Sequence, residues 1–452
     1  MSEISLVINN QRKYFQSGIL RSVDFRKKQL KLLKQALVKN YQGIVSALKA
    51  DINKSEEEAY ISEYTIVMNE LDCALKHISK WSKERKVPKT LMNIFSQGYV
   101  RHEPYGVCLI CSPWNYPIQL CFVPLIGAIM TGNTAILYLS PFVAETNKII
   151  KKIVSQIFNN KYVAAYEVWE LAYEDLFPQD NKYDFVFFTG SNRVGRIISE
   201  QCNRTSTPFV LETGGKSPTI VDAKVNIINA AKKIARGKWL NSGQTCIAPD
   251  YLVLDEKIYD KFIAELIKQI KNMYGDNMPK IITKVHFERL MSYVNENNLI
   301  YGGQNEPASN TIHPTLIRAN GFEDKSMQEE IFGPILPIIT YKKIDEILPI
   351  IANRPKPLAL YIFSNDNKFV DKCLNTINSG GVCINDTIMH ITNHHLPFGG
   401  IEESGVGNYH GKYSYHTFTH ARAVLKTSTK VDSKLFYPPW TKKKMKLLKK
   451  VI

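Results

Sequence analysis

One cysteine lies in a segment whose composition favours a bend. The run LNSGQTCIAPD places Cys246 between Gly-Gln-Thr and Pro-Asp, and glycine, proline and aspartate are residues that form turns. Most cysteines in soluble proteins behave as small buried hydrophobes. A thiol in such a bend is therefore either a nucleophile, since the thiolate is reactive, or an idle loop cysteine.

Three other polar residues follow predicted strands and could serve that thiol. Asn115, in PWNYP, could donate an amide hydrogen bond to an oxyanion, or it could be a turn residue between prolines. Glu212, in ETGGKSP, could be a general base or a cap for the next turn. Glu330, in QEEIFGP, carries the same ambiguity, with Phe332 as a core aromatic.

The run DFVFFTGSNRVG predicts a strand, a glycine turn and the start of a helix. Backbone N–H groups at such a helix start can hold a phosphate or pyrophosphate. Gly190 and Gly195 have the outline of a P-loop, but Arg196 stands where the P-loop lysine would be. The run does not match GxGxxG either. An ordinary strand–helix turn therefore remains open for this segment.

Composition predicts a globular protein of more than one domain. The chain has 452 residues, 44% hydrophobic and 22% charged, with a formal net charge of +16. Much of the positive charge lies in the last 27 residues, 426–452. We find no nucleic-acid-binding module and expect no nucleic-acid partner. No apolar run is long enough to span a bilayer, and the N-terminus lacks a signal peptide, so a cytoplasmic location is expected.

Cysteine and histidine spacing predicts no metal site. Cys108 and Cys111 form the only close cysteine pair among eight cysteines, and a zinc site would need a second CxxC. His410, His416 and His420 have no ligand partners at suitable spacing. We therefore expect the two cysteines in a buried strand and the three histidines at packing or interface positions.

Periodicity predicts helices over residues 20–90, followed by alternating strands and helices from about residue 107 to 205. Such alternation favours a parallel sheet covered by helices, the architecture that binds dinucleotides. A second α/β block follows from about residue 208 to the glycine-rich run LPFGGIEESGVG at 396–407.

The order Asn115, Gly190, Glu212, Cys246, Glu330 resembles the aldehyde dehydrogenase superfamily across nearly the whole chain. The runs SPWNYP, FFTGSNRVG, ETGGKSP, GQTCIAPDY, MQEEIFGPILP and LPFGGIEESGVGNYHGKYS are most similar to the class 3 branch. That branch contains dimeric enzymes acting on medium- and long-chain aliphatic and aromatic aldehydes. The resemblance implies an α/β fold with a Rossmann-type cofactor domain, an α/β catalytic domain and a small β bridging element.

The resemblance also implies roles for particular residues. Cys246 would be the nucleophile that forms a thiohemiacetal and then a thioester, Asn115 an oxyanion donor, and Glu212 the base that activates water. The implied cofactor is NAD or NADP. Residues expected to bind it are Thr189, Gly190, Ser191, Gly195, Glu330 and Phe332.

The implied domain organisation follows the motifs. The expected ranges are 1–85 and 104–211 for the NAD(P)-binding domain, 212–404 for the catalytic domain, 86–103 and 405–430 for the bridging and oligomerisation element, and 431–452 for a basic tail. A homodimer is expected. The tail run WTKKKMKLLKKVI is too polar to span a membrane, but it could contact anionic lipid.

Three departures concern the family pattern. Tyr138 replaces the usual lysine that binds the adenosine ribose, Trp169 stands where relatives have a glycine pair, and Thr213 replaces Leu or Met. These changes leave two alternatives open. One is a degenerate member that binds cofactor weakly and acts as a binding or structural protein. The other is a coenzyme A-acylating enzyme, against which Glu212 argues, because a water-activating base would waste the thioester.

Overall fold

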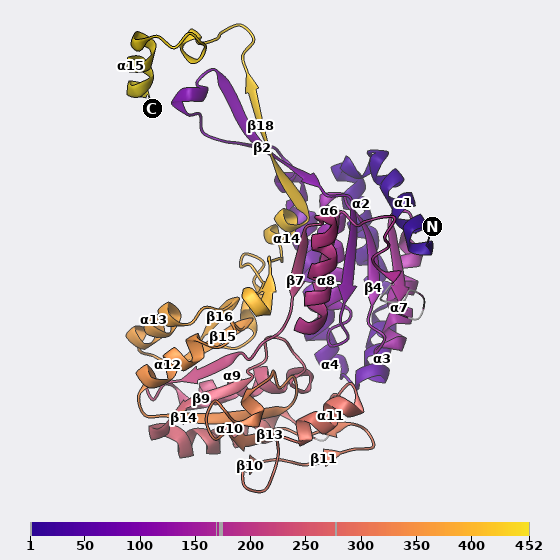
Figure 1. Ribbon diagram of the computed structural model, residues 1–452. Helices are drawn as coiled ribbons and strands as arrows, with labels where there is room; N and C mark the ends of the chain where they lie inside the picture. Colours follow the sequence, from indigo (N-terminus) through magenta and orange to yellow (C-terminus); the bar gives the residue numbers. More distant parts are fainter. Residues whose placement is uncertain (1, 169, 171–174, 276–277, 452) are drawn as a thin grey trace.

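The computed structural model describes residues 2–168, 170, 175–275 and 278–451. Figure 1 shows two α/β layers, one formed mainly by the N-terminal half of the chain and one by the C-terminal half, with a β arm that projects from the first. Trp169, one of the departures named above, lies outside the described residues.

The first layer is built on a six-stranded sheet of order β17-β7-β6-β3-β4-β5. All neighbours are parallel except β17, which pairs antiparallel with β7. The strands are β3 (Val107–Ser112), β4 (Thr134–Leu139), β5 (Val163–Glu167), β6 (Phe185–Thr189), β7 (Phe209–Glu212) and β17 (Gly405–Val406).

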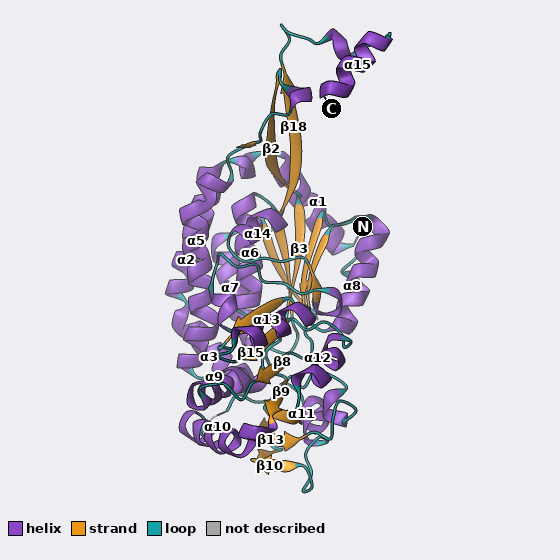
Figure 2. Ribbon diagram, turned by 90° about the vertical axis from the view of Figure 1, so that its left-hand side faces the viewer, coloured by secondary structure: helices purple, strands orange, loops and turns teal. Residues whose placement is uncertain are grey.

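Strand alternation in this sheet sends side chains to two cores, because successive residues point to opposite faces. Within β3, Cys108 and Ile110 join the large core, whereas Leu109 and Cys111 join a smaller one. Helices cover both faces, as Figure 2 shows. They are α1 (Glu3–Gln16), α2 (Val23–Lys39), α3 (Tyr41–Ile52), α4 (Glu56–Ala59), α5 (Thr65–Trp81), α6 (Gln119–Thr131), α7 (Ala144–Ile157) and α8 (Asn192–Thr205).

The second layer is built on a seven-stranded sheet of order β10-β13-β14-β9-β8-β15-β16. Its strands are parallel except β10, and they are β8 (Pro218–Val221), β9 (Tyr251–Asp255), β10 (Leu299–Tyr301), β13 (Thr315–Arg318), β14 (Ile335–Tyr341), β15 (Ala359–Phe363) and β16 (Gly381–Ile384). The covering helices are α9 (Ile227–Trp239), α10 (Tyr259–Met273), α11 (Lys284–Met291), α12 (Ile344–Ala352) and α13 (Asn367–Thr376), and a small hairpin joins β11 (Asn305–Glu306) to β12 (Thr311–Ile312).

The β arm is an antiparallel sheet of order β1-β2-β18. It pairs β2 (Ser96–Pro104) with β1 (Arg85–Lys86) on one side and with β18 (Thr419–Thr427) on the other. Beyond it, the chain ends in α15 (Lys442–Val451). Among the described helices, none combines the length and apolar character needed to cross a bilayer.

The predicted helix and strand order is confirmed through the two α/β blocks, and so is the α/β fold class. The expected start of the second block near residue 208 is wrong, because β7 pairs with β6 in the six-stranded sheet. Helix α1 was not predicted. The range 405–430, expected as part of the bridging element, divides in the structure: β17 extends the six-stranded sheet, α14 (Lys412–Thr417) packs on α6, and β18 joins the arm. The domain boundaries otherwise stay predictions.

Candidate active site

A cavity of about 840 Å³ lies between the two layers. It opens at the carboxyl ends of β3, β6 and β7 and faces the first residues of β8 and β9. Ligands of open parallel sheets bind outside these carboxyl ends. Among the sequence-predicted residues, the cavity lining includes Asn115, Thr189, Gly190, Ser191, Glu212, Cys246, Glu330 and Phe332.

Cys246 follows a kinked turn that the backbone forms after α9. Asn241 and Ser242 both have φ of 52°, and Gly243 has φ of 70°. A side chain at Gly243 would place its Cβ 2.2 Å from the Gly333 carbonyl oxygen, so only glycine fits there. The bend predicted from LNSGQTC is thus a buried left-handed turn, which presents the partly exposed Cys246 to the cavity.

The pKa of the Cys246 thiol is raised by burial, and the negative charges of Glu330 and Glu212 raise it further. The backbone N–H groups of Cys246 and Ile247 act in the opposite direction, because they donate to the sulfur. A thiolate at this position therefore depends on a nearby group that can accept the thiol proton.

Asn115 lies opposite the turn and is tied to it. Its side-chain Nδ2 donates to the Gln244 carbonyl oxygen at 3.0 Å, and its own backbone carbonyl accepts from Asn241 Nδ2 at 2.9 Å. An amide nitrogen carries two hydrogens. One therefore fixes the side chain, and the second can serve a ligand in the cavity.

A buried ion pair supports the Asn115 loop from behind. Lys54 Nζ lies 2.7 Å from Glu63 Oε1, with both side chains fully buried, and also donates to the Asn115 carbonyl at 3.2 Å. Glu63 Oε2 accepts from the backbone N–H groups of Ile118 and Gln119, at the start of α6. The sequence showed neither residue as part of the site, because both lie in the helical block where charged residues resemble solvated faces.

Glu212 is the last residue of β7, and its side chain is buried. Neither carboxyl oxygen has a hydrogen-bond partner among the described residues. Burial raises the pKa of Glu212 well above its usual range. A carboxyl group with a raised pKa and no competing partner can take up a proton near neutral pH.

Glu330 faces the glycine pair that follows Glu212. A Cβ on Gly214 would lie 2.2 Å from Glu330 Oε2, and the Gly215 backbone N–H donates to the carboxylate. Burial raises the pKa of Glu330 to about 8, and Asp250 contributes to the rise. The Gly-Gly pair is thus needed for the close approach of this carboxyl group.

Asp250 joins the three loops that carry these groups. One of its carboxyl oxygens contacts Lys216 Nζ, and the other accepts from the Ile331 backbone N–H at 2.8 Å. Lys216 also donates to the Glu329 carbonyl at 2.8 Å. Asp250, which ends the run LNSGQTCIAPD, therefore has a structural role beyond turn formation.

Phe332, at φ of 48°, packs edge-on against Trp114 with ring centroids 5.6 Å apart.

The glycine turn leads into α8, whose N-terminus faces the cavity. Ser191 caps the helix by accepting from the Val194 N–H at 3.4 Å. The Thr189 hydroxyl is buried without a hydrogen-bond partner among the described residues. A Cβ on Gly190 would lie 2.6 Å from the Phe188 ring, and one on Gly195 would lie 3.2 Å from the Thr213 methyl group. A helix N-terminus beside an unsatisfied hydroxyl fits a pyrophosphate.

Tyr138 does not line this cavity. It is 6% exposed in β4 and packs in the smaller core of the six-stranded sheet, with Cys111 and Phe188. The replacement of lysine by tyrosine therefore removes a cation without placing a ring in the described cavity. The loss of the lysine at position 138 therefore still supports the alternative of a degenerate member, and its other observation, Trp169, lies outside the described residues.

Fold and cavity together define a class of protein. A helix N-terminus suited to a dinucleotide pyrophosphate lines the same cavity as a thiol, an amide and two carboxyl groups, and this combination is typical of an enzyme that binds a dinucleotide cofactor.

Comparison with known proteins identifies the family. The model of the aldehyde dehydrogenase family matches residues 2–424. The chain is 40% identical to 4,4'-diaponeurosporen-aldehyde dehydrogenase of Staphylococcus aureus, covering 99% of each chain. It is 38% identical to mouse aldehyde dehydrogenase family 3 member A2, covering 96% of this chain and 91% of that one. A solved structure of substrate-bound Staphylococcus aureus AldH superposes with a TM-score of 0.96 at 39% identity, covering 100% of this chain and 99% of that one.

The chain belongs to the aldehyde dehydrogenase family. It is an aldehyde dehydrogenase of class 3 type, which oxidises an aldehyde to the carboxylic acid with NAD(P). The family and fold predicted from the ordered motifs are confirmed.

Proposed function

We propose that Cys246 is the nucleophile of this oxidation, that Asn115 is the oxyanion donor and that Glu212 is the general base. The observation that carries the proposal is the convergence of these residues, from three separate loops, on one cavity. Thr189, Gly190, Ser191 and Gly195 would hold the cofactor pyrophosphate. Glu330 would hold the nicotinamide ribose, with Phe332 packed beside it.

In the first step, the Cys246 sulfur forms a bond to the aldehyde carbon, and the carbonyl π electrons move to oxygen. The resulting oxyanion accepts from the second Nδ2 hydrogen of Asn115 and from the Cys246 backbone N–H. One such donor is worth roughly 3–4 kcal/mol of transition-state stabilisation. The fixed contact from Asn115 to Gln244 keeps this donor in place before the substrate arrives.

NAD(P)⁺, when bound by these residues, would supply the hydride acceptor for oxidation of the thiohemiacetal carbon, which would leave the acyl group on Cys246 as a thioester. Glu212 then removes a proton from water, whose oxygen attacks the thioester carbon. The carbon–sulfur bond breaks, the acid leaves and the thiolate is restored. The unpartnered carboxyl of Glu212 suits this step, since no hydrogen bond has to break before it takes the proton.

The roles are separated by two variants. Cys246→Ser should abolish the fast formation of reduced cofactor, because no thiohemiacetal forms. Glu212→Gln should still form about one reduced cofactor per active site, more slowly than the wild type because the thiol loses its proton acceptor, and should lose turnover by about 10²–10⁴-fold, the usual contribution of a general base. Intact-mass spectrometry should show the acyl group on Cys246. Wild-type turnover in either variant would contradict the assigned role.

We also propose an apolar aldehyde as substrate. Close to Asn115, the cavity is lined by Trp114, Leu120 and Phe332. Each methylene buried there contributes about 0.8 kcal/mol, so kcat/KM should rise about fourfold per added carbon along a series of straight-chain aldehydes until the pocket is filled. A flat series would contradict an apolar substrate site.

We propose that the enzyme uses both NAD and NADP. The described residues that would contact cofactor face the pyrophosphate and the nicotinamide ribose, which both cofactors share. Among relatives, a mouse protein is named as NADP-preferring, 37% identical over 447 residues. Initial rates with each cofactor at saturating aldehyde measure the preference. A kcat/KM ratio above about 10³, which takes about 4 kcal/mol of discrimination, would contradict dual use.

A homodimer formed through the β arm is proposed from its exposed apolar side chains. Leu91 is 61% exposed, Met92 52% and Leu425 55%. Exposed apolar patches of this kind mark interaction sites, and β18 is an edge strand of the arm. Light scattering should give twice the chain mass of 51.6 kDa, and Leu425→Lys should shift it to the monomer. A monomeric wild type would contradict the proposal.

Peripheral contact with anionic membranes is proposed for α15. Its lysines accompany the exposed side chains of Trp440, Met445 and Leu447. Each lysine near an anionic surface adds roughly 1 kcal/mol. Sedimentation with phosphatidylserine vesicles should retain the full chain at low salt and release it at high salt, and a chain ending at residue 430 should stay in solution. Equal sedimentation of both chains would exclude the tail as the contact.

A further inference from the structure

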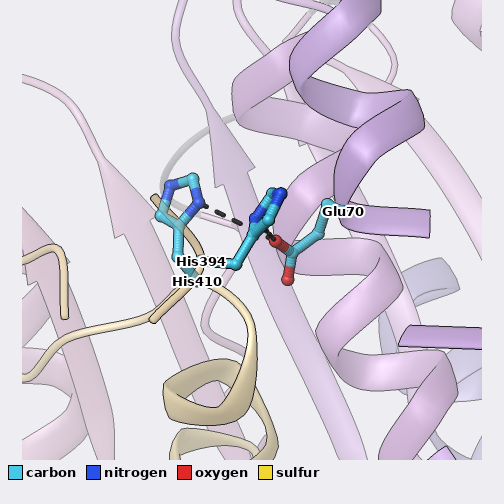
Figure 3. Close-up of side chains that lie close together, drawn as sticks. All are labelled: Glu70, His394 and His410. Carbon is cyan, nitrogen blue, oxygen red and sulfur yellow. Dashed lines mark ion pairs between the residues drawn. The ribbon is translucent and has the colours of Figure 1, made fainter. Parts of the chain in front are cut away.

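A second cluster of chemically reactive side chains lies outside the cavity. Figure 3 shows Glu70 from α5 facing His394 and His410 from two separate loops. His394 follows the short helical turn η8 (Met389–Thr392), and His410 lies between β17 and α14. Each residue offers one ligand atom, and the three atoms lie within 4.8 Å of one another. None of the three residues lines the catalytic cavity.

The backbone around the cluster is shaped to bring these residues together. Glu70 Oε1 accepts from the Gly411 N–H at 2.9 Å, and His410 N–H donates to Ser414 Oγ at 2.8 Å. Gly411 has φ of 54°, and a Cβ there would lie 2.4 Å from the His394 carbonyl oxygen. The His394 and His410 loops are therefore packed against each other and against α5.

Apart from their ion-pair contacts with one another, the ligand atoms have no hydrogen-bond partners among the described residues. These atoms are Glu70 Oε2, His394 Nδ1 and both ring nitrogens of His410, all buried. The side chains of Glu70 and His410 are each 1% exposed. His394 Nδ1 pairs with Glu70 Oε2 at 3.3 Å, whereas neither ring nitrogen of the buried His410 has a partner within hydrogen-bond distance among the described residues. Leaving a buried polar atom unsatisfied costs roughly 1–3 kcal/mol, so the cluster has room for a further partner that binds His410.

The spacing fits a small cation. Glu70 Oε2 lies 3.3 Å from His394 Nδ1 and 3.8 Å from His410 Nδ1. Bonds of about 2.0–2.1 Å to a tetrahedral ion place neighbouring ligands about 3.3–3.4 Å apart. The 3.3 Å separation matches this spacing and the 3.8 Å separation exceeds it, so binding of the ion would draw the three ligand atoms, which lie within 4.8 Å of one another, closer together.

We propose that Glu70, His394 and His410 form a zinc site. Two imidazoles and one carboxylate suit zinc and disfavour magnesium and calcium, which prefer oxygen ligands. The His394 side chain is 25% exposed, so solvent can reach the fourth position. From the sequence, His410 was expected at a packing or interface position. Its partners in the cluster could not be predicted, because they lie on distant parts of the chain.

Bound zinc would act on stability and not on aldehyde chemistry. It would fasten the two loops that flank the glycine-rich run LPFGGIEESGVG to α5. Tyr409, adjacent to His410, is buried and close enough to Glu212 and Cys246 for their charges to raise its pKa. The clamp would therefore hold the wall behind the catalytic residues.

The test uses the full chain with Cys246→Ser, which removes the active-site thiol as a competing ligand. After incubation with zinc and dialysis, elemental analysis should find one zinc per chain. Glu70→Gln keeps an acceptor for the Gly411 N–H but loses the anionic ligand, and His394→Ala removes a partly exposed ligand. Each should weaken zinc binding by at least tenfold, because even the loss of a residue that hydrogen-bonds to a metal ligand typically costs about 10- to 100-fold in metal affinity. His395→Ala, at the exposed neighbouring histidine, is the matched control and should bind as the parent does.

Two further readouts identify the ligands. Cobalt(II) in the Cys246→Ser chain should give visible d–d bands of a tetrahedral site without a thiolate charge-transfer band, and Glu70→Gln should abolish them. Zinc should raise the melting temperature of the parent and of His395→Ala, but not of the ligand variants. Absence of zinc uptake, a thiolate band, or equal uptake in Glu70→Gln would overturn the proposal.

Discussion

The buried ion pair behind Asn115 gives a prediction that depends on the structure alone. Lys54→Met removes the cation, keeps much of the side-chain volume and leaves Glu63 as a buried carboxylate. Glu63 retains two backbone donors, at 2.9 and 3.1 Å, but loses its charge partner at 2.7 Å. The Asn115 carbonyl also loses the Lys54 donor at 3.2 Å.

The expected size follows from these contacts. Removing one partner of a buried pair costs about 3–5 kcal/mol, because the remaining charge stays unpaired. A hydrogen bond to a charged group is worth about 1.5–3 kcal/mol. Here it orients the loop that carries the oxyanion donor, so we assign its loss to kcat, where it corresponds to about 10- to 100-fold. We therefore expect the free energy of unfolding to fall by about 3–5 kcal/mol and kcat to fall by about 10- to 100-fold.

Denaturant unfolding and steady-state kinetics measure the two effects on the same preparation. The double variant with Glu63→Gln removes the unpaired charge, so it should recover much of the lost stability. Lys31→Met, at an exposed lysine of α2, is the control and should change neither quantity. A Lys54→Met protein as stable and active as Lys31→Met, or a double variant less stable than Lys54→Met, would refute the reasoning.

Two other predictions concern Glu330. Gly214→Ala places a Cβ 2.2 Å from Glu330 Oε2, so it should displace the carboxyl group and raise KM for NAD(P) about tenfold or more. The control Gly275→Ala, whose Cβ meets open space, should leave KM unchanged. Equal KM values in the two variants would contradict the proposed contact between Glu330 and the ribose. The pKa of Glu330 rises from 4.5 to about 8 on burial, so the folded state favours the protonated form and wild-type stability falls as pH increases through that window. Glu330→Gln lacks this loss, and its melting temperature should gain on the wild type between pH 6 and pH 9; a constant difference would contradict the raised pKa.

Features with a local signature could be predicted from the sequence. Cys246, Glu212 and Asn115 each follow a strand or turn with distinctive neighbours. The glycines beside them are required by close contacts, with the Glu330 carboxyl group at Gly214 and with the Gly333 carbonyl at Gly243. The two sheets and their covering helices could also be predicted, because strand alternation and helix periodicity are both visible within a few neighbouring residues.

Features that depend on distant contacts could not be predicted. Lys54 and Glu63 lie in a helical block rich in charged residues, where periodicity cannot separate a buried pair from a solvated one. Glu70, His394 and His410 come from three unconnected segments. Tyr138 was predicted only as the replacement of a lysine, and the packing of its ring in the smaller core of the six-stranded sheet depends on neighbours from other strands. In each case, the missing information is which face of an element packs against which neighbour.

Burial raises the pKa of Cys246 and of Glu212 together, and the proposed mechanism depends on their difference. Transfer of a proton from the thiol to the carboxylate moves one negative charge within the site, so the desolvation that both forms share largely cancels. Two backbone N–H groups stabilise the thiolate, whereas Glu212 has no partner among the described residues to stabilise its carboxylate. The charge of Glu330 acts in the opposite direction, because it raises the pKa of the thiol. In the proposed mechanism, Glu212 accepts the thiol proton first and releases it before it acts on water, so one unpartnered carboxyl group would serve both steps.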